Sequence, residues 1–373
     1  MRCIHYITND GNFSELAPSP DALILEAQAD FALNLMRELS KNGNSCIVSP
    51  FSVAIALSMV YVGAKEKTGK EMGQLLAKGA PEAEVHKYFG ALLNAIKNGQ
   101  NNYTLEVANK VYVKDGFEVM DAFKAQIAEH YGGQFEAVDF ADSVGAAKKI
   151  NTFVEEATHE KIHDLITSDS LGELTRLVLI NAVYFKGNWA DKFDSKFTKK
   201  RTFYVDEKNS KELDMMHKKD DFIYFEDDQL QLLGMPYQGE NVFMFVMLSK
   251  ERFGLAKIRG KREVQVVLPK FKLESTHQLN KPLANMGMAT AFSDSANFEG
   301  IANGPLKISE VVQKAFIEVN EEGTEAAAAT YLTIQFKSMP PPAPVFSADH
   351  PFAIFLMSNN YGEVPLFGVT FRG

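Results

Sequence analysis

The sequence contains very few cysteines. Its 373 residues include two, Cys3 and Cys46, which are too few to form a disulfide framework. It also lacks any apolar run of about 18 residues, the length that a membrane-spanning helix requires. These two absences argue against a small disulfide-stabilised domain and against a helical membrane protein. We therefore expect no membrane partner.

The N-terminal stretch lacks the pattern of a secretory signal. Residues 1–20 contain Arg2, Asp10 and Glu15, are interrupted by Gly11 and two prolines, and include no apolar core segment. This composition predicts a cytoplasmic protein, with secretion by a non-classical route as the alternative.

Long runs of like charge, linkers and internal repeats are missing as well. The formal net charge of −9 and the pI of about 5.5 argue against nucleic acid as a partner. Because no Gly/Ser tract divides the chain, we predict an N-terminal extension over 1–20 and a single domain over 21–373. Helical patterns come first, and strand-like runs such as Leu177 to Phe185 follow. This order predicts an α+β fold.

Most enzyme signatures are also absent, including Gly-x-Ser-x-Gly and Gly-x-Gly-x-x-Gly. The exception is His159-Glu160-Lys161-Ile162-His163, which on a helical turn would offer two imidazoles to zinc and a glutamate as base. Asp169 and Glu173 are the nearest downstream carboxylates, yet residues 167–172 have the composition of a turn. A solvated helix end with incidental histidines is the other interpretation. We expect no metal and no cofactor, and a zinc metalloprotease acting through His159 and His163 is kept as an alternative.

The most distinctive segment that is present connects two strand-like runs, Ile308 to Val319 and Phe352 to Ser358. It reads Glu321-Glu322-Gly323-Thr324-Glu325-Ala326-Ala327-Ala328-Ala329-Thr330, followed by Tyr331 to Met339. Connections longer than about 12–15 residues are usually functional or disordered. No proline interrupts Gly323 to Met339, so every residue there is able to donate to a sheet ladder.

This segment also alternates in character, as a half-buried strand does. In an extended conformation one face is small or apolar; it consists of Thr324, Ala326, Ala328, Thr330, Leu332 and Ile334. The opposite face is more polar and includes Glu325, Thr333 and Gln335. A loop that can also form a strand suggests a conformational switch.

The segment from Glu321 to Thr330 resembles the hinge of the inhibitory serpins, the serine-protease-inhibitor superfamily. Further stretches resemble serpin signatures in the expected order: Ser49-Pro50-Phe51-Ser52, Asn181 to Trp189, Leu268-Pro269-Lys270-Phe271 and Ala348-Asp349-His350-Pro351-Phe352. The lead-in from Phe316 to Asn320 looks most like the intracellular, ovalbumin-like branch. The resemblance implies a serpin fold, in which helices pack on large mixed and antiparallel sheets and a reactive-centre loop is exposed at about 321–345.

What the resemblance implies is a monomeric protease inhibitor rather than an enzyme. The target serine protease cleaves the loop and is trapped as a covalent acyl complex. The loop then inserts into a sheet as a new strand. The family's spacing from Gly323 puts the reactive bond at Lys337–Ser338, which suits a trypsin-like protease. Phe336 and Met339 are alternative reactive positions for a chymotrypsin-like enzyme. A non-inhibitory serpin-like binding protein is the alternative function.

The resemblance also assigns two regions of the sheet that would receive the loop. Ser49, Ser52, Asn181 and Gln313 belong to the shutter, where side chains hydrogen-bond across the sheet. Trp189 belongs to the breach, where the hinge first enters.

Two positions and one segment depart from the family pattern. Gln313 replaces the usual histidine; because glutamine both donates and accepts, we expect the hydrogen-bond network to survive and its histidine-linked pH dependence to be lost. The segment from Ser249 to Glu263 is much shorter than in the family, which we expect to affect the stability of a sheet more than the chemistry of the loop. Glu160 stands where members often have glycine, which favours the helix-end interpretation of the histidine pair.

Overall fold

The computed structural model describes residues 18–98, 103–249, 261–322, 343–358 and 364–373. Within these ranges the α-helices are α1 (Pro20–Leu39), α2 (Pro50–Tyr61), α3 (Glu66–Ala77), α4 (Glu82–Asn98), α5 (Asp121–Tyr131), α6 (Ser143–Ala157) and α7 (Asn280–Leu283). None of the helices in these ranges combines the length and apolar character needed to cross a bilayer. Helix α1 begins at Pro20, with the Ser19 side chain accepting from the backbone N–H of Ala22 at 3.3 Å. The predicted division between an extension and a domain stays a prediction.

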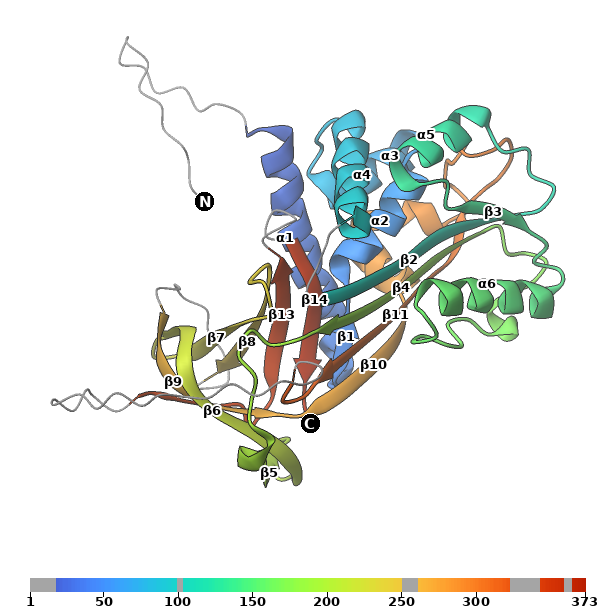
Figure 1. The fold of residues 1–373 in the computed structure, drawn as a ribbon. Coiled ribbons are helices and arrows are strands. Elements are labelled where there is room, and N and C mark those ends of the chain that lie inside the picture. Colours follow the sequence, from blue (N-terminus) through green and yellow to red (C-terminus); the bar gives the residue numbers. More distant parts are fainter. Residues whose placement is uncertain (1–17, 99–102, 250–260, 323–342, 359–363) are drawn as a thin grey trace, which may run out of the picture.

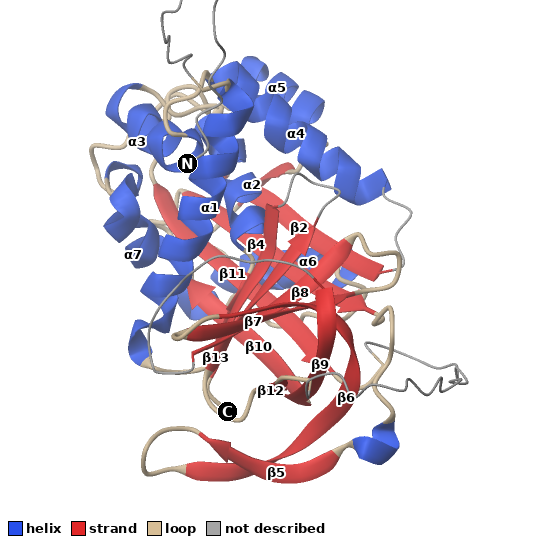
Figure 2. Ribbon diagram, turned by 90° about the vertical axis from the view of Figure 1, so that its left-hand side faces the viewer, coloured by secondary structure: helices blue, strands red, loops and turns tan. Residues whose placement is uncertain are grey.

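The strands form two sheets. A five-stranded sheet has the order β10-β11-β4-β2-β3, and its strands are β2 (Tyr103–Lys114), β3 (Phe135–Val138), β4 (Leu177–Gly187), β10 (Phe271–Gln278) and β11 (Ile308–Val319). The nine-stranded sheet contains β1 (Cys46–Val48), β5 (Lys199–Tyr204), β6 (Ser210–Glu226), β7 (Leu230–Pro236), β8 (Val242–Ser249), β9 (Lys261–Pro269), β12 (Val345–Ser347), β13 (Phe352–Ser358) and β14 (Val364–Phe371). Figure 2 shows most helices gathered at one end of the molecule and the strands at the other. The predicted α+β class, with helices packed on large mixed sheets, is confirmed.

Helix α2 lies between the two sheets. It contacts β2 and β4 on one side and β14 on the other, and every one of its residues is buried. Pro50 stands in its first turn, where the missing N–H costs no helical hydrogen bond. The uninterrupted apolar composition of this segment is what a helix covered on all sides requires.

Strand β4 is buried on both faces, as its apolar run predicted. Leu177, Leu179, Val183 and Phe185 point into the main core that also contains α2. The alternate residues Val178, Ile180, Ala182 and Tyr184 join a second core under α6, which also includes Val312 of β11. Helix α6 therefore covers the outer face of the five-stranded sheet across the line where β4 meets β11 (Figure 1).

Candidate functional site

The candidate site is the joint between β4 and β11, the two strands at the centre of the five-stranded sheet. They pair in parallel, with register partners running from Leu177 opposite Ile308 to Phe185 opposite Ile317. On the outer sides, β4 pairs antiparallel with β2, and β11 pairs antiparallel with β10. Parallel pairing is slightly less stable per residue than antiparallel pairing, so this joint is a weak line through the middle of the sheet.

A row of buried amide side chains crosses this joint. Asn109 of β2 lies opposite Asn181 of β4, and Asn181 lies opposite Gln313 of β11. The side-chain amide of Gln313 donates to Oδ1 of Asn181, and the amide of Asn181 donates to Oδ1 of Asn109. We call Asn109, Asn181 and Gln313 the polar row. All three are at most 5% exposed, so their hydrogen bonds form away from bulk water, where each counts for more.

The start of α2 is bound to the polar row. The backbone N–H of Ser49 donates to Oε1 of Gln313 at 2.9 Å, and Nε2 of Gln313 donates to the Ser49 carbonyl at 2.9 Å. Oγ of Ser52 accepts from the amide of Asn181, and Oγ of Ser49 donates to the carbonyl of Leu366 at 2.7 Å. Opening the joint between β4 and β11 therefore breaks side-chain bonds as well as the backbone ladder.

The structure brings together the four residues assigned to the shutter, Ser49, Ser52, Asn181 and Gln313. Gln313 uses both its donor and its acceptor, which is the bonding expected of it. Sequence reasoning missed Asn109. The available signal was that Asn109 falls on the same alternating face as Val107 and Val111. Whether the network acts as a shutter stays a prediction.

A histidine lies at the end of the same row. His277 of β10 is the register partner of Gln313, and its Nε2 donates to the carbonyl of Ile47 at 2.8 Å. Burial lowers the pKa of His277, and the bond to Ile47 opposes this only in part, so the neutral ring is favoured in the folded protein. A titratable ring is thus next to the polar row, although Gln313 itself cannot titrate.

Trp189 holds the chain where it leaves β11. Its indole Nε1 donates to the carbonyl of Asn320 at 2.9 Å, and its backbone N–H donates to the carbonyl of Glu322 at 3.2 Å. The indole is 2% exposed and stacks on Tyr237 with ring centroids 4.5 Å apart. These contacts fix the residues directly before Gly323, which is the location expected for the breach.

Glu321 is bound from two sides at the same place. Its Oε2 lies 2.9 Å from Nζ of Lys270, and its Oε1 accepts from Oγ1 of Thr198 at 2.7 Å. The residue is only 7% exposed. Burial raises the pKa of the Glu321 carboxyl, but the hydrogen bonds from Lys270, Thr198 and the backbone of Glu321, together with the charge of Lys270, outweigh burial and hold that pKa below its usual value. A charged group thus ties the first hinge residue to the body of the molecule.

The rest of the predicted loop lies outside the described residues. This applies to the hinge from Gly323 to Thr330 and to all four reactive positions, Phe336, Lys337, Ser338 and Met339. Most of the shortened connection also lies outside the described residues. Strand β8 ends at Ser249, β9 begins at Lys261, and residues 250–260 between them are not described.

The zinc interpretation of His159 and His163 is wrong in its geometry. Helix α6 ends at Ala157, and His159 has φ 49° and Glu160 φ 58°, so the two histidines do not lie on one helical turn. His159 is 3.4 Å from Glu106, whereas His163 is 3.3 Å from Glu155. No group of three potential metal ligands occurs among the residues that the structure describes. The left-handed backbone at Glu160 also explains why glycine suits this position.

Comparison with known proteins gives one consistent result. The family model described as "Serpin (serine protease inhibitor)" matches residues 26–371. Serpin B6 of Pongo abelii is 37% identical over 370 residues, covering 93% of this chain and 98% of its own. The human leukocyte elastase inhibitor is 36% identical over 370 residues, covering 92% and 97%. The crystal structure of Serpin48 from the insect Tenebrio molitor superposes with a TM-score of 0.83 at 34% identity, covering 96% of this chain and 100% of that one.

The fold and these matches define a protein of the protease-inhibitor class rather than an enzyme. The chain belongs to the serpin family. Its resemblance to the ovalbumin-like branch is confirmed by the relatives named above, Serpin B6 and the leukocyte elastase inhibitor.

The Lys270–Glu321 pair predicts a specific loss of stability. Replacing Lys270 by glutamine leaves a buried carboxylate without its cation, so we expect the free energy of unfolding to fall by about 1–3 kcal/mol. Lys272→Gln is the matched control, because Lys272 pairs with Glu318 at a more exposed site and its loss should cost at most ~1 kcal/mol. Denaturant unfolding of the intact chain measures both. Equal losses would contradict the role given to Glu321.

His277 predicts a pH dependence of stability. Its pKa in the folded chain lies below its unfolded value of about 6.5, so the unfolded chain binds the proton more readily. Its contribution to stability is therefore complete above pH ~6.5 and is lost as the pH falls towards the folded pKa. We expect His277→Gln to flatten the decline in unfolding free energy between pH 7.5 and 5. Superimposable pH profiles of the two proteins would show that His277 does not contribute.

Proposed function

We propose that this serpin inhibits serine proteases as a suicide substrate, with Lys337–Ser338 as the reactive bond. The observation that carries the proposal is the parallel pairing of β4 with β11 immediately before the hinge. A segment that turns back after Glu322 runs antiparallel to β11, and because β4 is parallel to β11, it also runs antiparallel to β4. Its insertion would replace one parallel ladder by two antiparallel ladders, which favours the inserted state.

The proposed reaction begins as ordinary proteolysis. The serine hydroxyl of the protease attacks the carbonyl carbon of Lys337, the bond to Ser338 breaks, and the new amine leaves with a proton. The product is an ester between Lys337 and the protease. Once cut, the segment after Gly323 is free to enter the sheet and carries the attached protease with it. A lysine at the cleaved bond suits a protease whose specificity pocket holds an aspartate.

The side chains of the hinge support easy entry. On the inserting face Thr324, Ala326 and Ala328 are small, so the first steps between β4 and β11 meet little steric resistance. The bonds that entry must break are those of the polar row, of Trp189 and of Glu321. We infer that these contacts hold the sheet closed until the loop is cut.

The proposal also includes the oligomeric state, the cellular location and the target of the protein. We take it to be a monomer that acts inside the cell, since its relatives belong to the ovalbumin-like branch. Its partner is a trypsin-like protease bound covalently. A chymotrypsin-like protease using Phe336 or Met339 is the alternative target, and a non-inhibitory binding protein is the alternative function.

Mixing the chain with trypsin tests the reactive bond. We expect an SDS-stable complex of the summed masses and a released C-terminal peptide that begins at Ser338 by mass spectrometry. Lys337→Ala is the control and should form no complex with trypsin. A peptide with another N-terminus would contradict the assignment of the bond. Cleavage at Ser338 without a complex would favour the non-inhibitory alternative.

A pair of loop variants tests strand insertion. Ala328→Glu puts a carboxylate on the face that would enter the core, and burying an unpaired charge is costly, so insertion should slow and trypsin should cleave the variant as a substrate. Ala327→Glu carries the same charge on the opposite face, where the native segment already has Glu325, and should remain an inhibitor. The measurement is the number of serpin molecules consumed per trypsin inactivated, which we expect to rise several-fold for Ala328→Glu alone. The same value for both variants would sink the proposed insertion face.

A further inference from the structure

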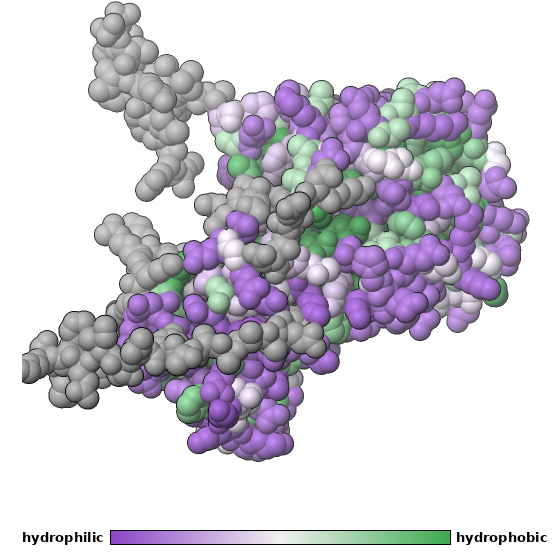
Figure 3. All heavy atoms as spheres, viewed as in Figure 1, coloured by the Kyte–Doolittle hydropathy of each residue, from purple (hydrophilic) through white to green (hydrophobic). Residues whose placement is uncertain are grey.

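A cavity lies under α6, on the opposite face of the sheet from the polar row. It has a volume of about 400 Å³, is lined by residues of α6, β2 and β3, and is open to solvent on one side. Small-molecule sites usually fall in the range of about 300–1,000 Å³. Figure 3 shows hydrophilic residues over α6 and an apolar hollow beside it, between α4 and α6. The cavity is therefore large enough for a compact ligand, and both charged and aromatic side chains line it.

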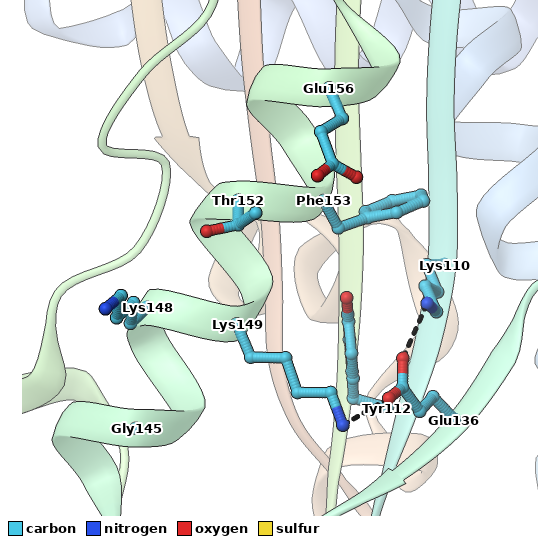
Figure 4. A pocket seen from close by; sticks show the side chains of 9 residues that line it. All are labelled: Lys110, Tyr112, Glu136, Gly145, Lys148, Lys149, Thr152, Phe153 and Glu156. Carbon is cyan, nitrogen blue, oxygen red and sulfur yellow. Dashed lines mark ion pairs between the residues drawn. The ribbon is translucent and has the colours of Figure 1, made fainter.

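One wall of this cavity carries a buried hydroxyl without a partner. Tyr112 of β2 is fully buried, and its Oη has no hydrogen-bond partner among the described residues. Figure 4 shows its ring upright between α6 and β2, with the hydroxyl directed towards Phe153 and away from Glu136. Buried polar groups in folded proteins are nearly always bonded, and one left unbonded is costly. The hydroxyl of Tyr112 is thus a donor in need of an acceptor.

Positive charge is concentrated beside this hydroxyl. Nζ of Lys110 is 2.6 Å from Glu136 and lies 4.6 Å from the ring centre of Phe153, and its side chain is only 16% exposed. Lys149 of α6 pairs with the other oxygen of the same carboxylate. An ammonium group has three donors, so the bond to Glu136 leaves Lys110 with donors to spare. Two lysines share one glutamate here, and the charges of Lys148 and Glu156, which also line the cavity, offset each other, so the lining has one net positive charge.

We propose that the cavity between α6, β2 and β3 binds a small aromatic monocarboxylate. Its carboxylate accepts from Nζ of Lys110 and, once the side chains of Tyr112 and Phe153 shift to uncover it, from the Tyr112 hydroxyl, while its ring packs along Phe153. The single negative charge matches the net charge of the wall, and the aromatic body matches the rings of Tyr112 and Phe153. Such a ligand satisfies a hydroxyl that the protein itself leaves unbonded.

Calorimetric titration of the intact chain with 2-naphthoate tests this site, with the neutral 2-naphthalenemethanol as a probe of the same shape. We expect the carboxylate to bind and the alcohol to bind at least about tenfold more weakly, because only the former makes charge-assisted hydrogen bonds. Absence of naphthoate binding, or equal binding of both probes, would overturn the proposal.

Three variants place the binding within the cavity. Tyr112→Phe removes only the unpartnered hydroxyl, so the protein should be at least as stable as before while naphthoate binding weakens about tenfold. Glu136→Gln removes the carboxylate that competes for Lys110 and Lys149, so naphthoate should bind more tightly. Lys124→Gln on α5, which does not line the cavity, is the charge control and should change nothing. Unchanged affinity in Tyr112→Phe, with its unfolding transition intact, would refute the site.

Discussion

The parallel hydrogen bonding between β4 and β11 is the constraint on which the rest of the structure depends. Both strands have stronger antiparallel partners on their outer sides, and the chain leaves β11 just where a returning segment would enter between them. The sheet is complete as it stands, since both faces of β4 are covered by packed cores. We propose that a sheet with one further strand between β4 and β11 is nevertheless more stable. A closed sheet with a weak central joint is the physical basis of the metastable inhibitor that we propose.

We propose that polar contacts, more than apolar packing, keep this joint closed. The polar row links β2, β4 and β11 to the start of α2, while Trp189 and Glu321 hold the end of β11. Hydrogen bonds of this kind are directional and are lost after a small displacement, whereas apolar contacts can slide. The joint can therefore resist spontaneous opening and yet give way cooperatively once its first bonds break. Gln313 uses both its donor and its acceptor in these contacts, and His277 brings a titratable ring next to it.

Much of this arrangement could be predicted from the sequence, because it follows from local patterns. The run from Leu177 to Phe185 indicated a central strand, and resemblance to the family found Ser49, Ser52, Asn181 and Gln313. Asn109 was missed because its importance depends on strand register, which joins residues far apart in the chain. The histidine pair could be interpreted in two ways from the sequence, as a zinc site or as a solvated helix end. The structure supports the helix end, because α6 ends at Ala157 and both histidine side chains are exposed. The backbone is left-handed at His159 and Glu160, a conformation that non-glycine side chains seldom adopt and do not signal clearly. The cavity under α6 could not be predicted, since it arises from the packing of three separate elements.

Thermal unfolding before and after cleavage of the loop tests the central claim most directly. If the closed joint between β4 and β11 is the less stable arrangement, the cut segment inserts and the chain gains two antiparallel ladders and buries the small face of its hinge. We predict that the chain cleaved after Lys337 unfolds at a clearly higher temperature than the intact chain. A cleaved chain that unfolds at the same or a lower temperature would contradict this account.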